Sequence, residues 1–386
     1  MGNNFKMTAK TMYGLEEILA TELRKLGASG VRVGTRHVSF YGDLGFMYKA
    51  NLCCRTAIKI LKPVANFPVF SEEDLYKKVY DFAWEDYMQS DGRLAIDATV
   101  HSQQFTHSKY IALKTKDAIV DRFRDKFGHR PDVDLDHPTL RINVHIDKNR
   151  CTLSLDSSGD SLHKRGYKVA NTIAPINEVL AAGMIMLTGW QGQCDFLDPM
   201  CGGGTILTEA AMIACKIPPN LNREEFAFEL WPDFDVDLYE TIEEAALKKI
   251  VDFNYKIRGY DTDPIVLKKA KENIKSANLG AFIDVEQNDF FETKKLEEKP
   301  LFIVFNPPYD ERIAVNAEKF YASIGTTLKH GYPDTQAWMI SSNMEALKHV
   351  GLRPSRKIKL YNGKLESRFC CYQMYAGSKK AKKQHP

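Results

Sequence analysis

Beyond about residue 170, short apolar segments alternate with segments of helical periodicity, and this alternation is the feature that most constrains the fold. Strands are predicted over 194–198, 257–261, 282–287, 301–305 and from 338, with helices over 176–187, 206–215 and 264–277. Two closing segments, 356–361 and 369–375, predict an antiparallel pair. This order predicts an α/β fold with a mostly parallel, doubly wound sheet, whose ligands bind at the carboxyl ends of the strands.

The N-terminal part of the chain differs in pattern from the α/β part, and 386 residues exceed one average domain. It predicts two α+β units, of which the second closes with a β-hairpin over 140–156. The segment 216–256 is too long for a simple connection, so we interpret it as an insertion near the ligand-binding edge with a helix at 238–251. We expect three domains and a basic tail, at residues 1–64, 65–165, 166–378 and 379–386.

Composition and charge limit the classes of protein to which this chain can belong. Apolar residues make up 44% of the sequence, yet no run approaches the ~20 residues of a membrane helix, and no signal-peptide pattern opens the chain. The eight cysteines show no CxxC spacing, so we expect free thiols, no metal site and a cytoplasmic protein. The net charge of +3 does not itself indicate nucleic acid; the basic tail is either a solvated end or an arm that contacts phosphates.

A glycine-rich turn follows the first strand of the α/β part, in the sequence Asp198-Pro-Met-Cys-Gly-Gly-Gly-Thr205. The glycines at 202–204 have no β-carbon, so a ligand can approach the backbone closely. Phosphate is disfavoured, because no lysine follows the glycines and the charge of Asp198 would repel it. An acid at this position suits a cationic ligand, such as the ammonium group of a sulfonium cofactor.

Two further acids follow successive strands of the predicted sheet. Asp261 can accept hydrogen bonds from both ribose hydroxyls of a nucleoside, while Asp263 caps the helix that follows. Asp289 can accept from an adenine amino group, with Phe290 packed against the ring. Three acids at three successive strand ends predict a ligand that contains a nucleoside.

The segment Asn306-Pro-Pro-Tyr309 follows an apolar strand. Its two prolines fix the backbone and remove two N–H donors, which leaves the carbonyl oxygen of Pro307 directed at the site. With the side-chain oxygen of Asn306 it forms a pair of acceptors that matches the two N–H groups of an exocyclic amine. Such a clamp turns the lone pair of the amine toward a methyl carbon, so positioning supplies most of the rate. Tyr309 offers a face on which an extruded base can stack.

These segments resemble the signatures of Rossmann-like amino-group methyltransferases, Asp-Pro-x-Cys-Gly-x-Gly-Thr and Asn-Pro-Pro-Tyr. Residues 102–123 resemble the THUMP domain of RNA-modifying enzymes. Lys164-Arg-Gly-Tyr167 with Ala174-Pro-Ile-Asn-Glu178 resembles the junction into their catalytic domain. Asn306-Pro-Pro-Tyr-Asp-Glu-Arg312 resembles the catalytic loop of the RlmL-like ribosomal RNA guanine-N2 methyltransferases, and the resemblance covers nearly the whole chain.

The resemblance implies a methyltransferase domain preceded by ferredoxin-like and THUMP domains that present RNA. It implies S-adenosyl-L-methionine as the cofactor and 23S rRNA as the substrate, methylated at the exocyclic N2 of a guanine. The implied cofactor contacts are Asp198, Pro199, Cys201, Gly202, Gly204, Thr205, Asp261, Asp289 and Asn306. The implied catalytic residues are Asn306, Pro307, Pro308 and Tyr309. Glu178 lies either beside the cofactor or on an exposed helix face.

Other functions are compatible with the same motifs, because guanine N2 and adenine N6 are both exocyclic amines. A tRNA guanine-N2 methyltransferase is one alternative and an adenine-N6 DNA methyltransferase is another. A THUMP-like module without a DNA-reading motif favours RNA. An RNA-binding assembly factor with an inactive catalytic fold is a third alternative, against which the intact acids and clamp argue.

Overall fold

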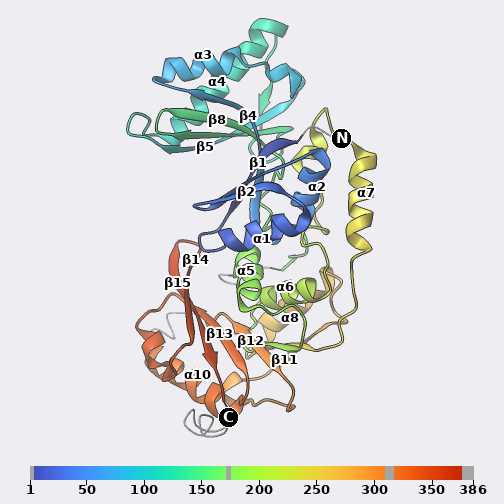
Figure 1. Cartoon of the computed structure of the whole chain (residues 1–386), viewed down its shortest axis with the longest axis vertical. Helices are drawn as coiled ribbons and strands as arrows, with labels where there is room; N and C mark the ends of the chain where they lie inside the picture. Colours follow the sequence, from blue (N-terminus) through green and yellow to red (C-terminus); the bar gives the residue numbers. More distant parts are fainter. Residues whose placement is uncertain (1–3, 171–174, 309–316, 376–386) are drawn as a thin grey trace. The chain divides into compact units, whose positions relative to one another are not determined.

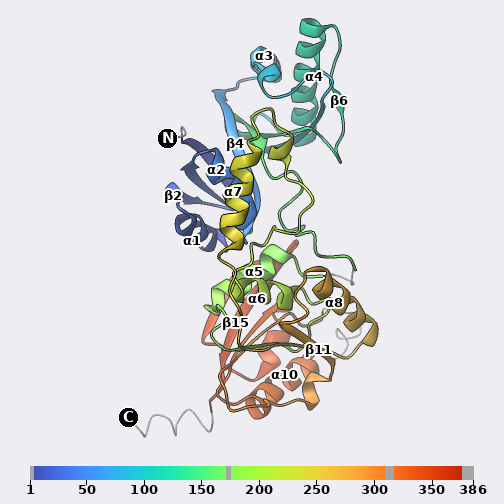
Figure 2. The same ribbon diagram turned by 90° about the vertical axis from the view of Figure 1, so that its right-hand side faces the viewer.

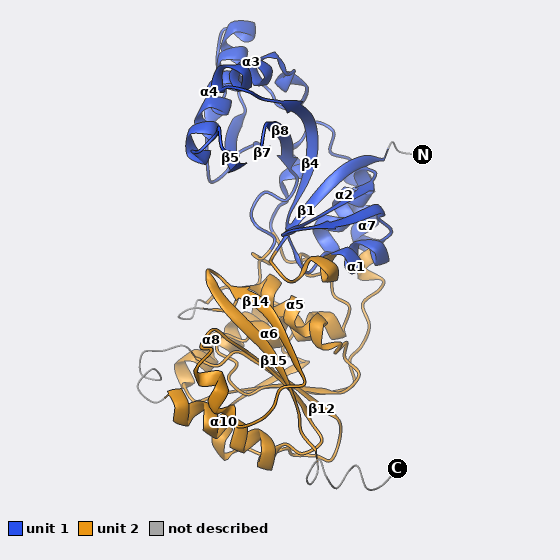
Figure 3. Ribbon diagram, turned by 60° about the vertical axis from the view of Figure 1, so that its left-hand side comes forward, with its two compact units in different colours: residues 1–11, 20–162, 224–245 blue, residues 12–19, 163–223, 246–386 orange. Residues whose placement is uncertain are grey.

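The protein was examined as a computed structural model, in which residues 4–170, 175–308 and 317–375 are described. The chain forms two compact units (Figure 3). Unit 1 comprises Met1–Thr11, Ala20–Leu162 and Glu224–Ala245, and unit 2 comprises Met12–Leu19, His163–Arg223 and Ala246–Pro386. Within the described ranges, the helices are too short or too polar to cross a membrane.

Unit 1 is built on one eight-stranded sheet with the strand order β2-β3-β1-β4-β8-β7-β5-β6 (Figures 1 and 2). Neighbouring strands pair antiparallel, except that β5 runs parallel to both β7 and β6. The long strand β4 joins the two halves of the sheet, because it pairs with β1 near its start and with β8 further along. The strands are β1 Phe5–Thr11, β2 Ser29–Gly34, β3 His37–Gly42, β4 Ala57–Pro68, β5 Arg93–His101, β6 Asp132–Val133, β7 Leu140–Asp147 and β8 Arg150–Asp156.

Helices cover one face of this sheet, because alternate strand residues are apolar and buried there. Met7 of β1 and Ile142 of β7 are fully shielded from solvent. Phe46 of the second helix packs edge-on against Phe40 of β3, with 5.7 Å between ring centroids. The predicted hairpin over 140–156 is confirmed as β7 and β8. The N-terminal helices are α1 Glu16–Leu26, α2 Leu44–Cys53, α3 Glu72–Asp81 and α4 Ser108–Phe127, and the short helix η1 Trp84–Asp86 follows α3.

Part of the segment that we interpreted as an insertion near the ligand-binding edge packs in unit 1 instead. It contains the short helix η2 Ala227–Leu230 and most of α7 Val236–Leu247, which matches the helix predicted there. Phe228 stacks on Tyr48 of α2 at 4.5 Å, and the backbone N–H of Asp235 donates to the Tyr48 hydroxyl at 3.0 Å. These aromatic contacts explain why residues 224–245 belong to the N-terminal unit.

Unit 2 is built on a seven-stranded sheet with the strand order β11-β10-β9-β12-β13-β15-β14. The first five of these strands run parallel, and β15 pairs antiparallel with β13 and β14. The predicted α/β sheet with an antiparallel final strand is therefore confirmed. The strands are β9 Asp195–Asp198, β10 Ile257–Asp261, β11 Ile283–Gln287, β12 Leu301–Phe305, β13 Gln336–Ser341, β14 Arg356–Asn362 and β15 Leu365–Gln373. The helices are α5 Glu178–Thr188, α6 Thr205–Ala214, α8 Pro264–Ser276 and α10 Ala317–Gly331, with short helices η3 Phe290–Glu292 and η4 Ala346–Val350.

The central strands of unit 2 are apolar throughout because both of their faces are covered. Phe196 of β9 and Ile303 and Phe305 of β12 are at most 1% exposed. Strands buried on both faces are typical of doubly wound sheets. This packed layer fixes the carboxyl ends of β9, β10 and β12, where the sequence predicted the ligand.

Candidate active site

The glycine-rich turn between β9 and α6 has the backbone conformation that its sequence predicted. Gly202 and Gly204 adopt φ of 54° and 79°, a region that side chains with a β-carbon rarely occupy. A β-carbon added at Gly202 would meet nothing within 4 Å. The turn therefore leaves open space beside its backbone, as close approach of a ligand requires.

Asp198 at the end of β9 is the strongest indication of a ligand in this turn. Its carboxyl group is buried, with 1% exposure of the residue. One oxygen accepts a hydrogen bond from the backbone N–H of Met200 at 3.1 Å, while the other, Oδ2, is buried without a donor among the described residues. Burial and the nearby charge of Asp261 raise the pKa of Asp198 well above its ordinary range. A cationic donor beside Oδ2 would relieve both penalties, so this site fits the ammonium group of S-adenosyl-L-methionine.

Asp261 and Asp289 both accept local backbone hydrogen bonds, in addition to the nucleoside contacts predicted for them. Asp261 Oδ2 accepts from the backbone N–H of Gly202 at 3.1 Å, and its Oδ1 accepts from the N–H of Asp263 at 3.0 Å. Asp289 is exposed and caps the short helix η3 by accepting from the N–H of Phe291 at 2.9 Å. Each carboxylate retains further lone pairs, so these bonds are compatible with contacts to a nucleoside.

Strand register brings the three acids to one edge of the sheet. Asp198 lies opposite Gly259 in the parallel pair β9–β10, which places Asp261 two residues beyond it. Asp261 in turn lies opposite Gln287 in the pair β10–β11, which places Asp289 two residues beyond that. The sequence predicted this grouping from strand ends alone.

The Asn306-Pro-Pro segment begins at the same edge. In the parallel pair β9–β12, Ile303 lies opposite Leu197, so Asn306 follows β12 just past the level of Asp198. Asn306 is half-buried, Pro307 is buried and Pro308 is exposed. Tyr309 lies outside the described residues.

The other predicted residues of the turn are buried and hold its shape. They are Pro199, Cys201 and Thr205. The backbone N–H of Cys201 donates to the carbonyl of Tyr260 at 2.8 Å. Burial and the neighbouring Asp198 raise the pKa of the Cys201 thiol, so this thiol packs the turn against β10 and is a poor nucleophile at neutral pH.

Asn273 of α8 is a site residue that sequence reasoning missed. It is 1% exposed. Its Oδ1 accepts from the backbone N–H groups of Val169 and Ala170 at 3.0 and 2.9 Å, and its Nδ2 donates to the carbonyls of Ala170 and Gly203 at 3.1 Å. One amide therefore ties the segment before α5 to the glycine-rich turn. A polar residue among the apolar positions of a helix was the available signal.

The segment tied by Asn273 borders a cavity of about 420 Å³. For Glu178, the sequence allowed either a place beside the cofactor or an exposed helix face. The residue is buried and forms an ion pair with Lys168. The side chain of Asn177 caps α5 by accepting from the N–H of Val179 at 2.9 Å. The cavity is lined by His163, Lys164, Arg165, Gly166, Lys168, Pro175, Ile176, Asn177 and Glu178.

We expect Asn273→Leu to weaken binding of S-adenosyl-L-methionine about tenfold, because the variant leaves backbone groups on both sides of the link unpaired, at ~1–3 kcal/mol each. Isothermal titration calorimetry measures the affinity. Asn273→Asp is a second variant that keeps an acceptor for the two N–H groups but turns a buried carboxylate oxygen toward the carbonyls of Ala170 and Gly203, so its affinity should also fall. Equal affinity in all three proteins would contradict the positioning role.

The fold and the edge that gathers Asp198, Asp261 and Asn306 are those of the Rossmann-like methyltransferases. The chain belongs to the family described as "RMKL-like, methyltransferase domain", which matches residues 165–369. A THUMP domain matches residues 70–156, and an RlmL ferredoxin-like domain matches residues 6–61. The resemblance drawn from the motifs is thereby confirmed at the level of all three domains.

Individual relatives agree with this assignment. The ribosomal RNA large subunit methyltransferase K/L of Syntrophotalea carbinolica is 38% identical over 94% of this chain and 53% of its own length. The Synechocystis protein slr0064, provisionally named an RNA methyltransferase, is 36% identical over 94% of this chain and 95% of its own length. The crystal structure of SMU.472, provisionally described as a methyltransferase and complexed with SAH, superposes with a TM-score of 0.85 at 28% identity, covering 98% of this chain and all of that one. The chain thus spans about half the length of the K/L enzyme.

Proposed function

We propose that the chain is an S-adenosyl-L-methionine-dependent RNA methyltransferase that methylates the exocyclic N2 of a guanine in 23S rRNA, in the cytoplasm. The observation that carries the proposal is the buried oxygen of Asp198, which has no donor in the part of the chain that the structure describes and lies at the same sheet edge as Asn306-Pro-Pro. The names of the K/L relatives and the SAH in the SMU.472 structure support the same reaction class.

Four residues at this edge would hold the cofactor. Asp198 Oδ2 would accept from the ammonium group, and the open side of Gly202 would receive the amino-acid part. Asp261 would accept from the ribose hydroxyls, and Asp289 would accept from the adenine amino group. When bound, S-adenosyl-L-methionine supplies an electrophilic methyl group on its sulfonium.

Asn306 and Pro307 act on the acceptor amine. The side-chain oxygen of Asn306 and the carbonyl oxygen of Pro307 would accept hydrogen bonds from its two N–H groups, which would direct the nitrogen lone pair along the line of displacement. The nitrogen would gain the methyl group that the cofactor supplies, the electrons of the broken carbon–sulfur bond would stay with the cofactor, and the nitrogen would then release one proton to solvent. No strong base is needed, because the proton leaves after transfer; the rate comes from orientation.

Mass-spectrometric mapping of rRNA, tRNA and DNA from a deletion strain tests the substrate. We expect one N2-methylguanosine of 23S rRNA to disappear, and to return with a plasmid that encodes the unmodified protein but not with one that encodes Asn306→Ala. Loss of N2-methylguanosine from tRNA alone would contradict the 23S rRNA substrate and support a tRNA guanine-N2 methyltransferase instead. Loss of N6-methyladenine from DNA, with all RNA unchanged, would refute an RNA substrate.

A further inference from the structure

One ion pair of unit 2 lies on the wall of a cavity. Lys168 and Glu178 form this pair, and both residues line the cavity of about 420 Å³. The Glu178 side chain is 6% exposed and that of Lys168 is 18% exposed, so the pair is largely shielded from solvent. Ligand pockets in proteins have volumes of roughly 300–1,000 Å³, a range that includes this cavity. The pair therefore lies where one small ligand can contact both of its charges.

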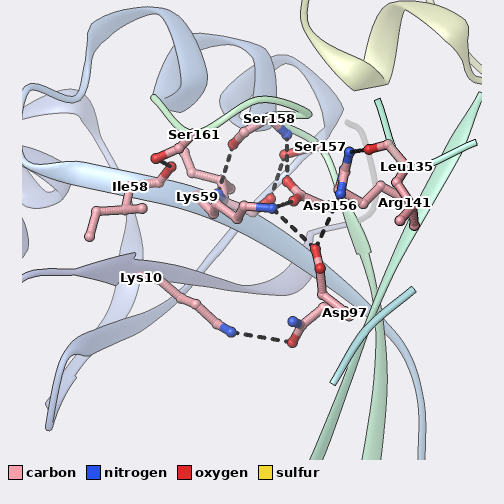
Figure 4. Close-up of polar contacts among 12 residues, drawn as sticks. Lys10, Ile58, Lys59, Asp97, Leu135, Arg141, Asp156, Ser157, Ser158 and Ser161 are labelled. Atoms are coloured by element: carbon pink, nitrogen blue, oxygen red, sulfur yellow. Dashed lines mark hydrogen bonds and ion pairs between the residues drawn. The ribbon is translucent and has the colours of Figure 1, made fainter. Parts of the chain in front are cut away.

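Stability alone does not explain an ion pair at this position. Buried pairs contribute little net free energy of folding, because desolvation of the charges offsets most of their attraction. A buried pair in unit 1, Lys59 with Asp156, joins the neighbouring strands β4 and β8, and Asp156 also accepts from the backbone N–H of Ser158 at 3.0 Å (Figure 4). Lys168 and Glu178 also connect two segments of the chain, but they do so on a cavity wall.

A phosphate group fits this cavity poorly. The buried guanidinium of Arg165 lies 3.3 Å from Glu209, so its charge is already balanced. Burial lowers the pKa of His163, which keeps its imidazole uncharged at neutral pH. Lys164 is exposed, so solvent and salt screen its charge. Glu178, the one carboxylate among the described residues that line the cavity, would repel a phosphate.

Hydrogen bonds link one residue of the cavity wall to the glycine-rich turn. Lys168 directly precedes Val169, whose backbone N–H donates to Asn273 Oδ1 at 3.0 Å. The Nδ2 of Asn273 donates to the carbonyl of Gly203 at 3.1 Å. A single amide group therefore connects the chain beside Lys168 to the turn at which the cofactor would bind. A ligand in the cavity can thus belong to the same reaction as the cofactor.

The pair has the hydrogen-bonding pattern that complements guanine. The Lys168 ammonium donates and the Glu178 carboxylate accepts, and the two groups are in contact. Guanine presents the acceptor O6 next to the donor N1–H on its Watson–Crick edge, and cytosine binds that edge with a donor beside an acceptor in the same way. Enzymes that act on an extruded base read it through this edge. Ile176, a buried residue of the cavity wall, adds apolar surface against which a planar base can pack.

We propose that Lys168 and Glu178 select guanine as the base to be methylated, with Glu178 accepting from N1–H and Lys168 donating to O6. The inference rests on the proposed function and adds the residues that determine which base is methylated. With the N2 amine held by Asn306 and Pro307, the next two groups along the edge of guanine are N1–H and O6. In adenine the group next to the N6 amine is the acceptor N1, which the carboxylate of Glu178 would repel.

The test compares two RNA substrates that both carry the target amine. An rRNA fragment that contains the mapped nucleotide is prepared with guanine or with 2,6-diaminopurine at that position. Diaminopurine keeps the amine at C2 but has an amine in place of O6 and an acceptor at N1. We expect the unmodified full-length protein to prefer guanine by about 10–100-fold in kcat/KM, the selectivity of one well-placed bidentate contact.

Glu178→Gln should remove most of this preference. Glutamine has nearly the same shape, and its amide can either accept from N1–H or donate to an unprotonated N1. We expect kcat/KM for guanine RNA to fall about tenfold or more and the preference over diaminopurine to fall below about threefold. Calorimetry should show the affinity for S-adenosyl-L-methionine within about twofold of the unmodified protein, which also verifies that the variant is folded.

The matched control is Glu345→Gln, which removes the same charge and an ion pair with Lys348 at an exposed position of unit 2. It should keep both the rate and the preference for guanine. Equal kcat/KM for the two RNAs in the unmodified protein, or an unchanged preference in Glu178→Gln, would overturn the proposal while leaving the methyltransferase function intact. A loss of cofactor affinity as large as the loss of methylation in Glu178→Gln would assign the pair to the cofactor and would also overturn it. If the unmodified protein methylates neither RNA, the proposed function itself has failed.

Discussion

Asn306→Ala is expected to lower the rate of methyl transfer by about 10²–10³-fold while leaving the affinity for S-adenosyl-L-methionine within about twofold. Alanine removes one of the two acceptors that fix the amine, so the lone pair loses its alignment. The backbone that surrounds the cofactor is untouched, because Asn306 follows β12 whereas the glycine-rich turn follows β9. Single-turnover rates with the RNA substrate measure the first effect, and calorimetry measures the second.

Asn306→Asp tests whether the side chain at this position acts as a hydrogen-bond acceptor or only fills space. Aspartate keeps an oxygen that can accept the amine hydrogen, so it should retain more activity than alanine. If the two variants are equally slow, the acceptor role of Asn306 is wrong. If Asn306→Ala turns over normally, the whole clamp is wrong.

The periodicity of apolar residues was sufficient to predict those elements whose burial pattern is visible within a single segment of the sequence. The strand β12 is an unbroken apolar run because it is buried on both faces, and the hairpin β7–β8 alternates because one face is apolar and the other polar. The turn after Asp198 could be predicted because only glycine readily adopts the φ found at Gly202 and Gly204. Because Asp198, Asp261 and Asp289 each lie at or just after the end of a parallel strand, the sequence also predicted that they lie at one edge of the sheet.

Long-range contacts could not be predicted in the same way. Asn273 bonds to Val169 and Ala170 more than one hundred positions away, and no periodic pattern encodes which loop a buried amide will reach. The unit 1 sheet brings Lys10 of β1 within 3.4 Å of Asn143 of β7, a contact that alternation within single strands does not reveal. The place of η2 and α7 depends on the stack of Phe228 on Tyr48, two aromatic residues that the sequence alone does not connect.

Asp198→Asn should weaken cofactor binding and stabilise the ligand-free protein at the same time. The variant keeps an oxygen for the N–H of Met200 but removes the charge that would pair with the ammonium, a charge-assisted bond worth ~1.5–3 kcal/mol, so Kd should rise about tenfold or more. Without ligand the same charge is buried near Asp261, and its Oδ2 has no donor among the described residues. Its removal should raise Tm, by ~2–4 °C for each kcal/mol in a domain of this size.

The pH dependence distinguishes this explanation from an unspecific effect of the substitution. In the folded protein the pKa of Asp198 is raised, whereas the unfolded chain ionises near the ordinary value of about 3.9. The folded state therefore loses stability as pH rises from the unfolded pKa up to the folded pKa, and Asp198→Asn abolishes that loss. The gain in Tm of Asp198→Asn should thus be large at neutral pH and shrink as the pH falls toward 4. Cofactor affinity of the unmodified protein should rise over the same interval, because the proton on Asp198 must leave before the ammonium binds. A Tm difference independent of pH would contradict the raised pKa of Asp198, and equal cofactor affinity in both proteins would show that Asp198 does not hold the cation.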